Sequence, residues 1–215
     1  IANIYRKAAH LSFVEAASMQ LVFMTAYEML VQRAHLSANE TVLIYGGCSG
    51  VGSAAIQIAS DIGANVIVTA GSEVKIEYLK KLGLDKVLSH NDNDLLTNLR
   101  EITNGKGVDV VFEHIGSNTW SNSLKILNKG GRIVTCGATT GSKVNIDLTH
   151  LFIKQQSLIG STMAGMTSFI KVMNKIKNKK YTPIIDKVFR LEEVKLAHEH
   201  IENRLNIGKV VLNNE

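Results

Sequence analysis

Thr41-Val-Leu-Ile-Tyr45, followed directly by Gly46-Gly47-Cys48-Ser49-Gly50-Val51-Gly52, is the stretch of sequence that decides the fold. The first five residues are mostly apolar and β-prone, which is typical of a strand that is buried on both faces. Small and apolar residues then recur at helical spacing over 50–62. A strand, a glycine turn and a helix in this order predict a phosphate site, because backbone amides can approach an anion closely there.

The glycine spacing departs from the most common dinucleotide fingerprint. GxGxxG would place glycines at positions 47, 49 and 52, and here Ser49 replaces the middle glycine while Gly50 stands beside it. The alternative is a tight strand-to-helix turn without a ligand. The βαβ context favours the nucleotide site, and the residues that we expect at the pyrophosphate are Gly47, Ser49, Gly50, Val51 and Gly52.

The same strand-and-helix pattern continues along the chain. Strands are predicted over 65–69, 86–89, 108–112, 131–136 and 157–160, and helices over 73–82, 92–103 and 119–127. Strands that alternate with helices of about ten residues predict a parallel sheet with both faces covered. We therefore predict the α/β class with a doubly wound parallel sheet, whose ligand crevice lies at the carboxyl ends of the strands.

The two ends of the chain follow other patterns. The first 40 residues are predicted to be helical, with Ser12 and Glu15 forming a capping box. After Pro183 we predict a strand over 184–189, a helix over 191–203 and a strand over 209–212. The predicted organisation is a linking helix region (1–40), a dinucleotide-binding domain (41–182) and a tail (183–215).

Composition limits the possible classes of protein. Hydrophobic residues make up 45% and charged residues 20% of the 215, as in globular proteins. The net charge of +5 is spread along the chain, and the densest run, 175–180, is interpreted as a solvated helix end rather than a nucleic-acid site. No apolar run approaches the length that spans a membrane. Two unpaired cysteines and no visible signal peptide predict a cytoplasmic protein. Because the chain starts at Ile1, we expect it to be part of a longer protein.

The end of the second predicted strand indicates the cofactor. NAD sites usually carry an acidic residue there, which binds the ribose hydroxyls. Here the strand ends Thr69-Ala-Gly-Ser72, without an acid, and Lys75 follows one turn later. Ser72 and Lys75 suit a 2′-phosphate, so NADP(H) is favoured. The alternative for Lys75 is an ordinary exposed helix lysine.

Two other nucleotide-using classes fit less well. Short-chain dehydrogenases need a tyrosine with lysine four residues later, and no tyrosine of this chain has one. Class I methyltransferases favour an acid after the second strand, which is absent here as well.

The order of several motifs resembles the C-terminal portion of the medium-chain dehydrogenase/reductase superfamily, in its quinone oxidoreductase-like branch. The resemblance covers essentially the whole chain. Besides the glycine turn and 69–72, it is carried by Glu15-Ala-Ala-Ser18, Leu21-Val-Phe-Met-Thr-Ala-Tyr27, Gly105-Lys-Gly-Val-Asp-Val-Val111, Gly130-Gly-Arg-Ile-Val-Thr-Cys-Gly-Ala-Thr-Thr140 and Gly208-Lys-Val-Val-Leu212.

The resemblance implies a Rossmann fold that follows a GroES-like catalytic domain, which is absent here, and a tail that returns to that domain. It implies that the nicotinamide is met by His114, Ile115, Gly116, Gly137, Ala138, Thr139, Ser161, Thr162 and Met163. It also implies that the adenosine phosphate is met by Ser72, Lys75, His90 and Arg204, although some relatives carry tyrosine at the position of His90.

Zinc is not expected in this chain. In zinc-dependent relatives the linking helix usually supplies one ligand, and alignment on Thr25-Ala-Tyr27 puts Leu21 at that position. His198 and His200 are the only close histidine pair, but their i, i+2 spacing on a helix turns the rings apart. No general acid or base stands out either, and Cys48 and Cys136 are interpreted as packing residues, so we name no catalytic residue.

The leading hypothesis is the NADP(H)-binding portion of an oxidoreductase that transfers hydride between NADPH and a quinone or activated alkene. One alternative is an alcohol dehydrogenase of the same superfamily with zinc ligands in the absent domain. Another is a non-catalytic nucleotide-binding or scaffolding module. We expect a small-molecule substrate, and a homodimer formed through the edge strand Ser157-Leu-Ile-Gly-Ser161, which contains neither proline nor charge.

Overall fold

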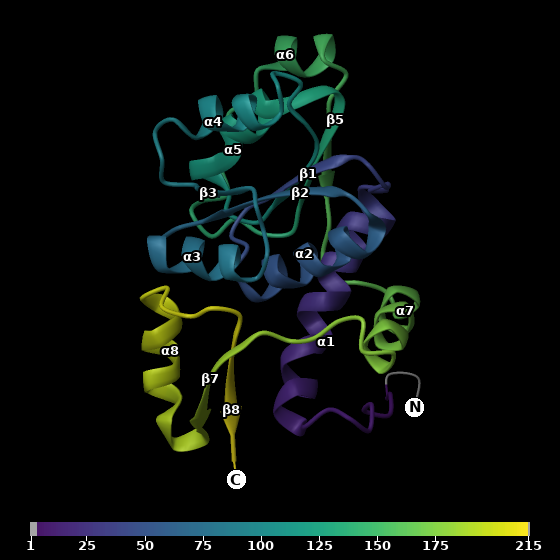
Figure 1. Cartoon of the computed structure of the whole chain (residues 1–215), viewed down its shortest axis with the longest axis vertical. Helices are drawn as coiled ribbons and strands as arrows, with labels where there is room; N and C mark the ends of the chain where they lie inside the picture. The colour runs from purple at the N-terminus through teal and green to yellow at the C-terminus, as the bar shows by residue number, and fades with distance from the viewer. Residues whose placement is uncertain (1–3, 215) are drawn as a thin grey trace.

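The computed structural model describes residues 4–214 and has a six-stranded parallel sheet at its centre (Figure 1). The strand order is β3-β2-β1-β4-β5-β6, and every neighbouring pair is parallel. The strands are β1 (Thr41–Ile44), β2 (Asn65–Ala70), β3 (Val87–Ser89), β4 (Val108–Glu113), β5 (Leu127–Thr135) and β6 (Ser157–Gly160). The order reverses between β1 and β4, so the predicted doubly wound α/β fold is confirmed.

Helices cover both faces of the sheet. α2 (Gly50–Ile62) and α3 (Glu73–Lys81) lie on one side of the strands in Figure 1, and α4 (Leu95–Ile102) and α5 (Ser117–Ile126) lie on the other. β1 shows why both faces are apolar: Ile44 belongs to the core cluster with α2, whereas Leu43 belongs to the cluster with α4 and α5. Successive side chains of a strand point to opposite faces, so a strand buried on both sides is apolar throughout.

The N-terminal region is less helical than predicted. α1 (Phe13–Tyr27) begins at the predicted capping box of Ser12 and Glu15, and residues 4–12 form no helix. The helix continues as the π-helical segment η1 (Glu28–Arg33) and then ends, because His35 has a φ of +50°, outside the right-handed region. The prediction of helix across all of 1–40 was therefore wrong at both ends, and residues 1–3 lie outside the described part.

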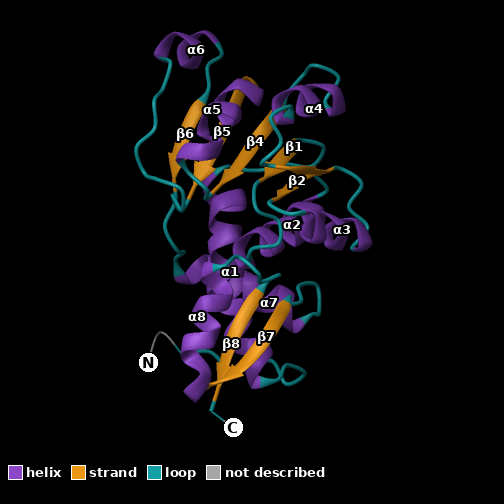
Figure 2. Cartoon of the chain, turned by 90° about the vertical axis from the view of Figure 1, so that its left-hand side faces the viewer, coloured by secondary structure: helices purple, strands orange, loops and turns teal. Residues whose placement is uncertain are grey.

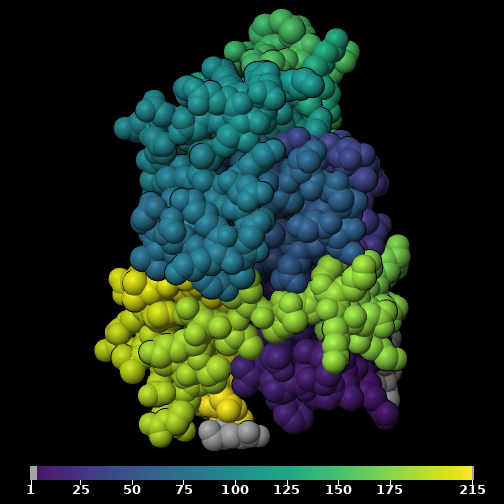
Figure 3. All heavy atoms as spheres, in the orientation of Figure 1, coloured from purple at the N-terminus to yellow at the C-terminus, as the bar shows by residue number. Residues whose placement is uncertain are grey.

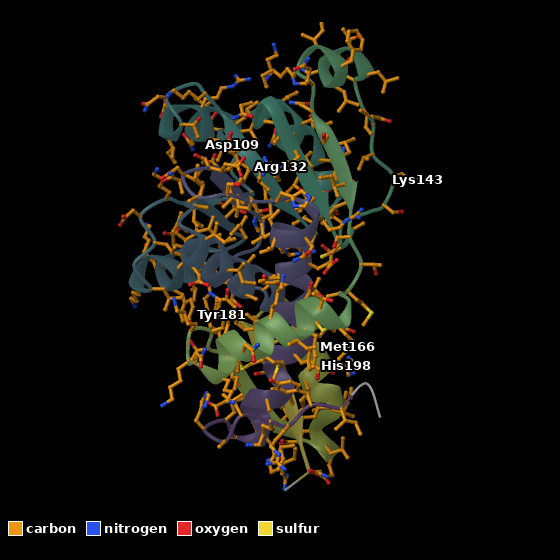
Figure 4. The ribbon with its side chains drawn as sticks, turned by 90° about the vertical axis from the view of Figure 1, so that its right-hand side faces the viewer. Asp109, Arg132, Lys143, Met166, Tyr181 and His198 are labelled. Atoms are coloured by element: carbon orange, nitrogen blue, oxygen red, sulfur yellow. The ribbon has the colours of Figure 1, made fainter. Side chains whose placement is uncertain are left out.

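Arg132, which is labelled in Figure 4, lies on β5 and bonds to the end of this helical region. Its guanidinium donates to the carbonyl oxygens of Ala34 and His35 and forms a two-pronged ion pair with Glu40, with N···O distances of 2.8 and 2.7 Å. Arg132 holds the pKa of the Glu40 carboxyl below its usual range. The contact ties the start of β1 to β5.

Other predicted boundaries differ by a few residues. β5 starts at Leu127 rather than Gly131, because Leu127 pairs with Val108 ahead of a register shift. α4 and α5 cover Leu95–Ile102 and Ser117–Ile126 instead of 92–103 and 119–127. The helix α6 (Leu148–Ile153) was not predicted, and of α7 (Met166–Lys177) only a helix end at 175–180 was.

The tail folds as a separate two-stranded parallel sheet. It contains β7 (Ile185–Arg190), the 3₁₀ turn η2 (Leu191–Glu193), α8 (Val194–Glu202) and β8 (Lys209–Asn213), which confirms the predicted strand, helix, strand order. Figure 2 shows this sheet on the far side of α2 and α3 from the main sheet, beside α1.

The basic run 175–180 is not simply a solvated helix end. Lys175 and Lys180 are partly exposed, but their ammonium groups lie 2.6 and 3.1 Å from the Asp61 carboxylate at the end of α2. The hydroxyl of Tyr181 donates to the same carboxylate at 3.1 Å. The run therefore fastens the end of α7 to the main domain.

Candidate functional site

The glycine turn is tight for reasons of packing. A side chain on Gly47 would lie 2.2 Å from Val68 Cγ2 of β2, and a side chain on Gly52 would lie 2.2 Å from the Gly46 carbonyl oxygen. Ser49 caps α2, because its hydroxyl accepts a hydrogen bond from the Gly52 amide at 2.9 Å. The amides that follow Ser49 belong to the first turn of α2, where a helix offers its own N–H groups no acceptor. This end of α2 suits an anion.

A cavity of about 720 Å³ opens beside this turn. It lies at the carboxyl ends of β1, β2 and β4, where ligands bind in doubly wound sheets. Its walls contain, from the main domain, Gly46, Cys48, Ser49, Ala70, Gly71, Ser72, Val74, Lys75, His90, Asn91, His114, Ile115, Asn118, Thr119, Thr139 and Thr140. Such a volume is in the range of small-molecule and cofactor sites.

The tail supplies the remaining wall, which consists of residues 201–207, that is, the end of α8 and the loop that follows it. Backbone bonding joins this loop to the glycine turn, because the Gly208 amide donates to the Cys48 carbonyl oxygen at 2.7 Å. Lys75 on α3 adds a second connection, since its ammonium donates to the Arg204 carbonyl oxygen at 2.7 Å. In Figure 3 the yellow tail abuts the blue atoms of the α3 region.

Gly208 has a backbone that only glycine adopts readily. Its φ is +86°, and a side chain there would lie 2.2 Å from the Ile184 carbonyl oxygen. The glycine of the motif Gly208-Lys-Val-Val-Leu212 is thus explained by the tight turn that precedes β8, where the chain bonds to the glycine turn.

One end of the cavity is lined by cationic and hydroxyl side chains. Ser72 is the N-cap residue of α3, yet its side chain makes no capping hydrogen bond within residues 4–214, which leaves the hydroxyl for a ligand. Lys75 and Arg204 line the same end. Burial lowers the pKa of Lys75. Burial also lowers the pKa of His90, and the neighbouring His114, Arg204 and Lys75 lower it further. His90 Nδ1 lies 3.2 Å from the Thr69 hydroxyl.

The other end of the cavity is formed by the loops after β4 and β5. His114 is buried and its Nε2–H donates to the Tyr45 carbonyl oxygen at 2.9 Å, so Nδ1 carries no proton in the neutral ring. Burial lowers the pKa of His114. Thr140 N donates to the Ile115 carbonyl oxygen at 2.7 Å, which joins the two loops.

The structure brings eight of the predicted site residues together at this cavity: Ser49, Ser72, Lys75, His90, His114, Ile115, Thr139 and Arg204. The others lie outside its walls, namely Gly47, Gly50, Val51, Gly52, Gly116, Gly137, Ala138, Ser161, Thr162 and Met163. Gly47 and Gly52 shape the turn from inside, whereas Thr162 and Met163 are exposed beyond β6. Their roles at a cofactor stay predictions.

Sequence reasoning missed most of the tail wall and several polar residues. Asn91 follows β3, Asn118 lies in the first turn of α5 after β4, and both line the cavity. Polar residues after the predicted strands were the signal that could have found them. Cys48 also lines it, but burial raises the pKa of its thiol to about 11, so it is no activated nucleophile. Glu113, fully buried behind the cavity, gave no signal because its environment depends on α5.

The described residues do not fit a metal site. Within residues 4–214, no group of three or more His, Cys, Asp or Glu side chains is arranged to hold a metal ion. Leu21 is an exposed residue of α1 and offers no ligand atom. His200 Nε2 lies 2.6 Å from Asp186 Oδ2, while His198 is exposed. The expectation of no metal in this chain stays a prediction.

Within residues 4–214, no helix has the length and apolarity needed to cross a membrane.

Known proteins that are similar in sequence agree with the fold. Residues 50–178 match the family described as "Zinc-binding dehydrogenase". A crotonyl-CoA reductase of Streptomyces avermitilis is 33% identical over 223 residues, which cover 95% of this chain and 50% of that protein. A quinone oxidoreductase of Homo sapiens is 28% identical over 217 residues, which cover 98% of this chain and 65% of that protein.

Solved structures show the same architecture. An NAD-dependent alcohol dehydrogenase matches with a TM-score of 0.93 and 37% identity, over 100% of this chain and 62% of that one. A 2-octenoyl-CoA carboxylase reductase, solved with NADP and 2-octenoyl-CoA, matches with a TM-score of 0.90 and 28% identity, over 98% of this chain and 52% of that one. The chain thus spans between half and two thirds of the length of these proteins.

Proposed function

Since the chain belongs to the zinc-binding dehydrogenase family, within the medium-chain dehydrogenase/reductase superfamily, we propose that it is the NADP(H)-binding portion of an oxidoreductase that transfers hydride between NADPH and an activated alkene or a quinone. The relatives named crotonyl-CoA reductase and quinone oxidoreductase support this class of substrate. An enoyl thioester, such as the crotonyl-CoA in the first relative's name, is an activated alkene.

The observation that carries the choice of cofactor is the cationic end of the cavity. Ser72, Lys75 and Arg204 line it together, and β2 ends without an acidic residue. A carboxylate at that position would repel a 2′-phosphate, whereas ammonium and guanidinium groups bind phosphates strongly. The one acidic side chain among the lining residues, Glu202, lies in the tail.

The chain's own part in the reaction is to hold and orient. The N-terminal end of α2 would receive the pyrophosphate, and the loops 114–116 and 137–139 would meet the nicotinamide. When bound, the cofactor supplies the hydride chemistry itself. The loops after β4 and β5 are joined by the hydrogen bond from the Thr140 amide to the Ile115 carbonyl oxygen. This bond gives the nicotinamide end of the cavity a fixed shape, which favours a single orientation of the nicotinamide ring. No step is assigned to zinc, because the described residues do not fit it.

The alcohol dehydrogenase alternative is favoured by one observation, the likeness to an NAD-dependent alcohol dehydrogenase at 37% identity. A nucleotide-binding module without turnover is the other alternative.

We further propose a homodimer through β6.

Assays of the longer protein that contains this chain separate these functions. We expect NADPH oxidation with an enoyl thioester, an enal or a quinone, and little oxidation of a primary alcohol. Turnover of alcohols alone would favour the dehydrogenase, and tight binding without turnover of any substrate would favour the module.

A further inference from the structure

Glu113, the last residue of β4, carries a carboxylate that is completely buried, with a relative exposure of 0%. Four groups donate hydrogen bonds to it. Oε1 accepts from the amides of Ile115 and Gly116 at 2.5 and 3.1 Å. Oε2 accepts from the hydroxyls of Thr119 and Ser123 at 2.8 and 3.2 Å.

A buried carboxylate is unfavourable unless it is compensated. No ion pair among the described residues involves Glu113. The compensation comes from the four donors and from the N-terminal end of α5, whose first turn adds positive potential. The carboxylate therefore binds the backbone of the loop after β4, at Ile115 and Gly116, and two hydroxyls of α5.

The loop that Glu113 holds is part of the cavity floor. Ile115 lines the cavity, and Gly116 has a φ of +98° with no room for a side chain, since one would lie 2.5 Å from the Gly141 carbonyl oxygen. Thr140 fastens the loop from the other side, because both its amide and its hydroxyl donate to the Ile115 carbonyl oxygen, at 2.7 and 2.8 Å.

His114 directly follows Glu113 in the chain, and its side chain points toward the end of β1 instead of toward α5. Its ring packs against Gly46, where a side chain would lie 3.1 Å from the imidazole, and it bonds to the Tyr45 carbonyl oxygen. Glu113 and His114 thus fix adjacent residues of one loop to two different elements, α5 and the end of β1.

We propose that Glu113 is a positioning residue for the nicotinamide end of the site, an inference that rests on the proposed NADP(H) function. Through the amides of Ile115 and Gly116 it fixes the loop that meets the nicotinamide, and it has no part in holding the 2′-phosphate at Ser72, Lys75 and Arg204.

The two oxygens of Glu113 predict different behaviour for different substitutions. In Glu113→Gln the amide oxygen takes the place of Oε1 and keeps both loop amides bonded. The NH₂ group then faces two hydroxyls that have other acceptors, since Thr119 Oγ1 lies 3.2 Å from the Gly116 carbonyl oxygen and Ser123 Oγ lies 2.9 Å from that of Thr119. Glu113→Leu removes both acceptors, and Glu113→Asp is one methylene too short to reach both pairs of donors.

The test compares two ligands by calorimetry on the wild-type chain and these variants: NADPH, and 2′,5′-ADP, which has the adenosine and 2′-phosphate without the nicotinamide. In Glu113→Leu we expect the Kd for NADPH to rise at least about tenfold, while the Kd for 2′,5′-ADP changes less than about twofold. Glu113→Gln should stay close to wild type for both ligands. Glu113→Asp should show the same selective loss as the leucine variant, and it decides the test if the leucine variant does not fold.

The outcomes separate this inference from the proposed function. A wild-type chain that binds neither ligand overturns the NADP(H) site and the inference with it. A wild-type chain that binds both, with variants that lose both ligands in parallel or lose neither, overturns only the positioning role. A glutamine variant as impaired as the leucine variant also counts against it, because the proposal assigns the effect to the hydrogen bonds of Oε1.

Discussion

Lys75 lies at the junction of the two parts of the site, with its ammonium 2.7 Å from the Arg204 carbonyl oxygen and its side chain in the cavity wall. We predict that Lys75→Glu weakens NADPH binding by about 1–3 kcal/mol, as expected for the loss of a charge-assisted contact. NADH, which has no 2′-phosphate, should be affected less. Fluorescence titration of both cofactors measures the difference.

Lys80→Glu is the matched control for this prediction. Lys80 lies on the same helix, is exposed and pairs with Glu77 at 2.9 Å, outside the cavity walls. It changes the net charge equally, so it should leave the preference between NADPH and NADH unchanged. An equal effect of the two substitutions would show a long-range charge effect instead of a contact.

At the scale of single residues, the sequence could identify groups whose role depends on the local chain. Ser72 and Lys75 were predicted because the end of β2 lacks an acid, and both line the cavity. Glu113 could not be found, because its role arises from the hydroxyls of Thr119 and Ser123, which only the packing of α5 brings to it. Arg204 came from the resemblance alone, since a tail residue has no sequence signal that places it beside α3.

The link between α2 and α7 depends on Asp61. Lys175, which lies 2.6 Å away, is the main group that holds the pKa of Asp61 below its usual range, and Lys180 and Tyr181 contribute. We predict that Asp61→Asn lowers the free energy of unfolding by about 1 kcal/mol at pH 7, the upper range for partly exposed pairs. Denaturant unfolding measures it.

The cost of Asp61→Asn should depend on pH. The folded pKa is lowered, so the carboxylate's stabilisation is fully present above the unfolded pKa of about 3.9 and is lost as the pH falls through the folded value. The difference between wild type and variant should therefore shrink between about pH 5 and pH 2. Asp85→Asn, at an exposed aspartate, serves as control. A cost that stays the same across this range would contradict the role of the charge.

The edge strand β6 carries the dimer prediction. Among the strands of residues 4–214, β6 pairs with β5 alone, and the tail lies elsewhere instead of covering it. Open edges are templates for pairing with another chain, and a two-fold axis closes such a contact. We predict a dimer at micromolar concentration in sedimentation experiments, and its loss in Leu158→Lys or Ile159→Pro.

Ile170→Lys is the control for the dimer, since Ile170 is an exposed residue of α7 and receives the same lysine. Leu158 and Ile159 pack partly against the core, so thermal unfolding should confirm that both strand variants remain folded. A monomeric wild type would refute the prediction, as would a dimer that persists in both strand variants.

At the scale of elements, the fold was largely predictable because strands buried on both faces give continuous apolar runs. The π-helical turn of η1 was not, and neither was the contact that follows it, in which Arg132 on β5 donates to the carbonyl oxygens of Ala34 and His35 from almost a hundred residues later in the chain. α6 was missed because none of its described residues is buried, so it has no apolar stripe facing a core.

At the scale of the whole molecule, the described residues form a doubly wound α/β domain and a tail that closes one wall of its cavity. We predict that the 215-residue chain alone oxidises no NADPH above background with a quinone or an enal. The cavity walls of the described residues offer no activated nucleophile, and the relatives are longer by a third to a half of their length. A spectrophotometric assay at 340 nm in the presence of each substrate checks this. Steady oxidation that scales with protein concentration would disprove it.

The relative affinity of the purified chain for NADPH and NADH, measured by calorimetry under identical buffer and salt, tests the proposed cofactor most directly. The two ligands differ only in the 2′-phosphate, which we assign to Ser72, Lys75 and Arg204. We predict that NADPH binds at least about tenfold more tightly, a difference of about 1.4 kcal/mol. Equal affinity, or tighter binding of NADH, would contradict the assignment of the cationic end of the cavity.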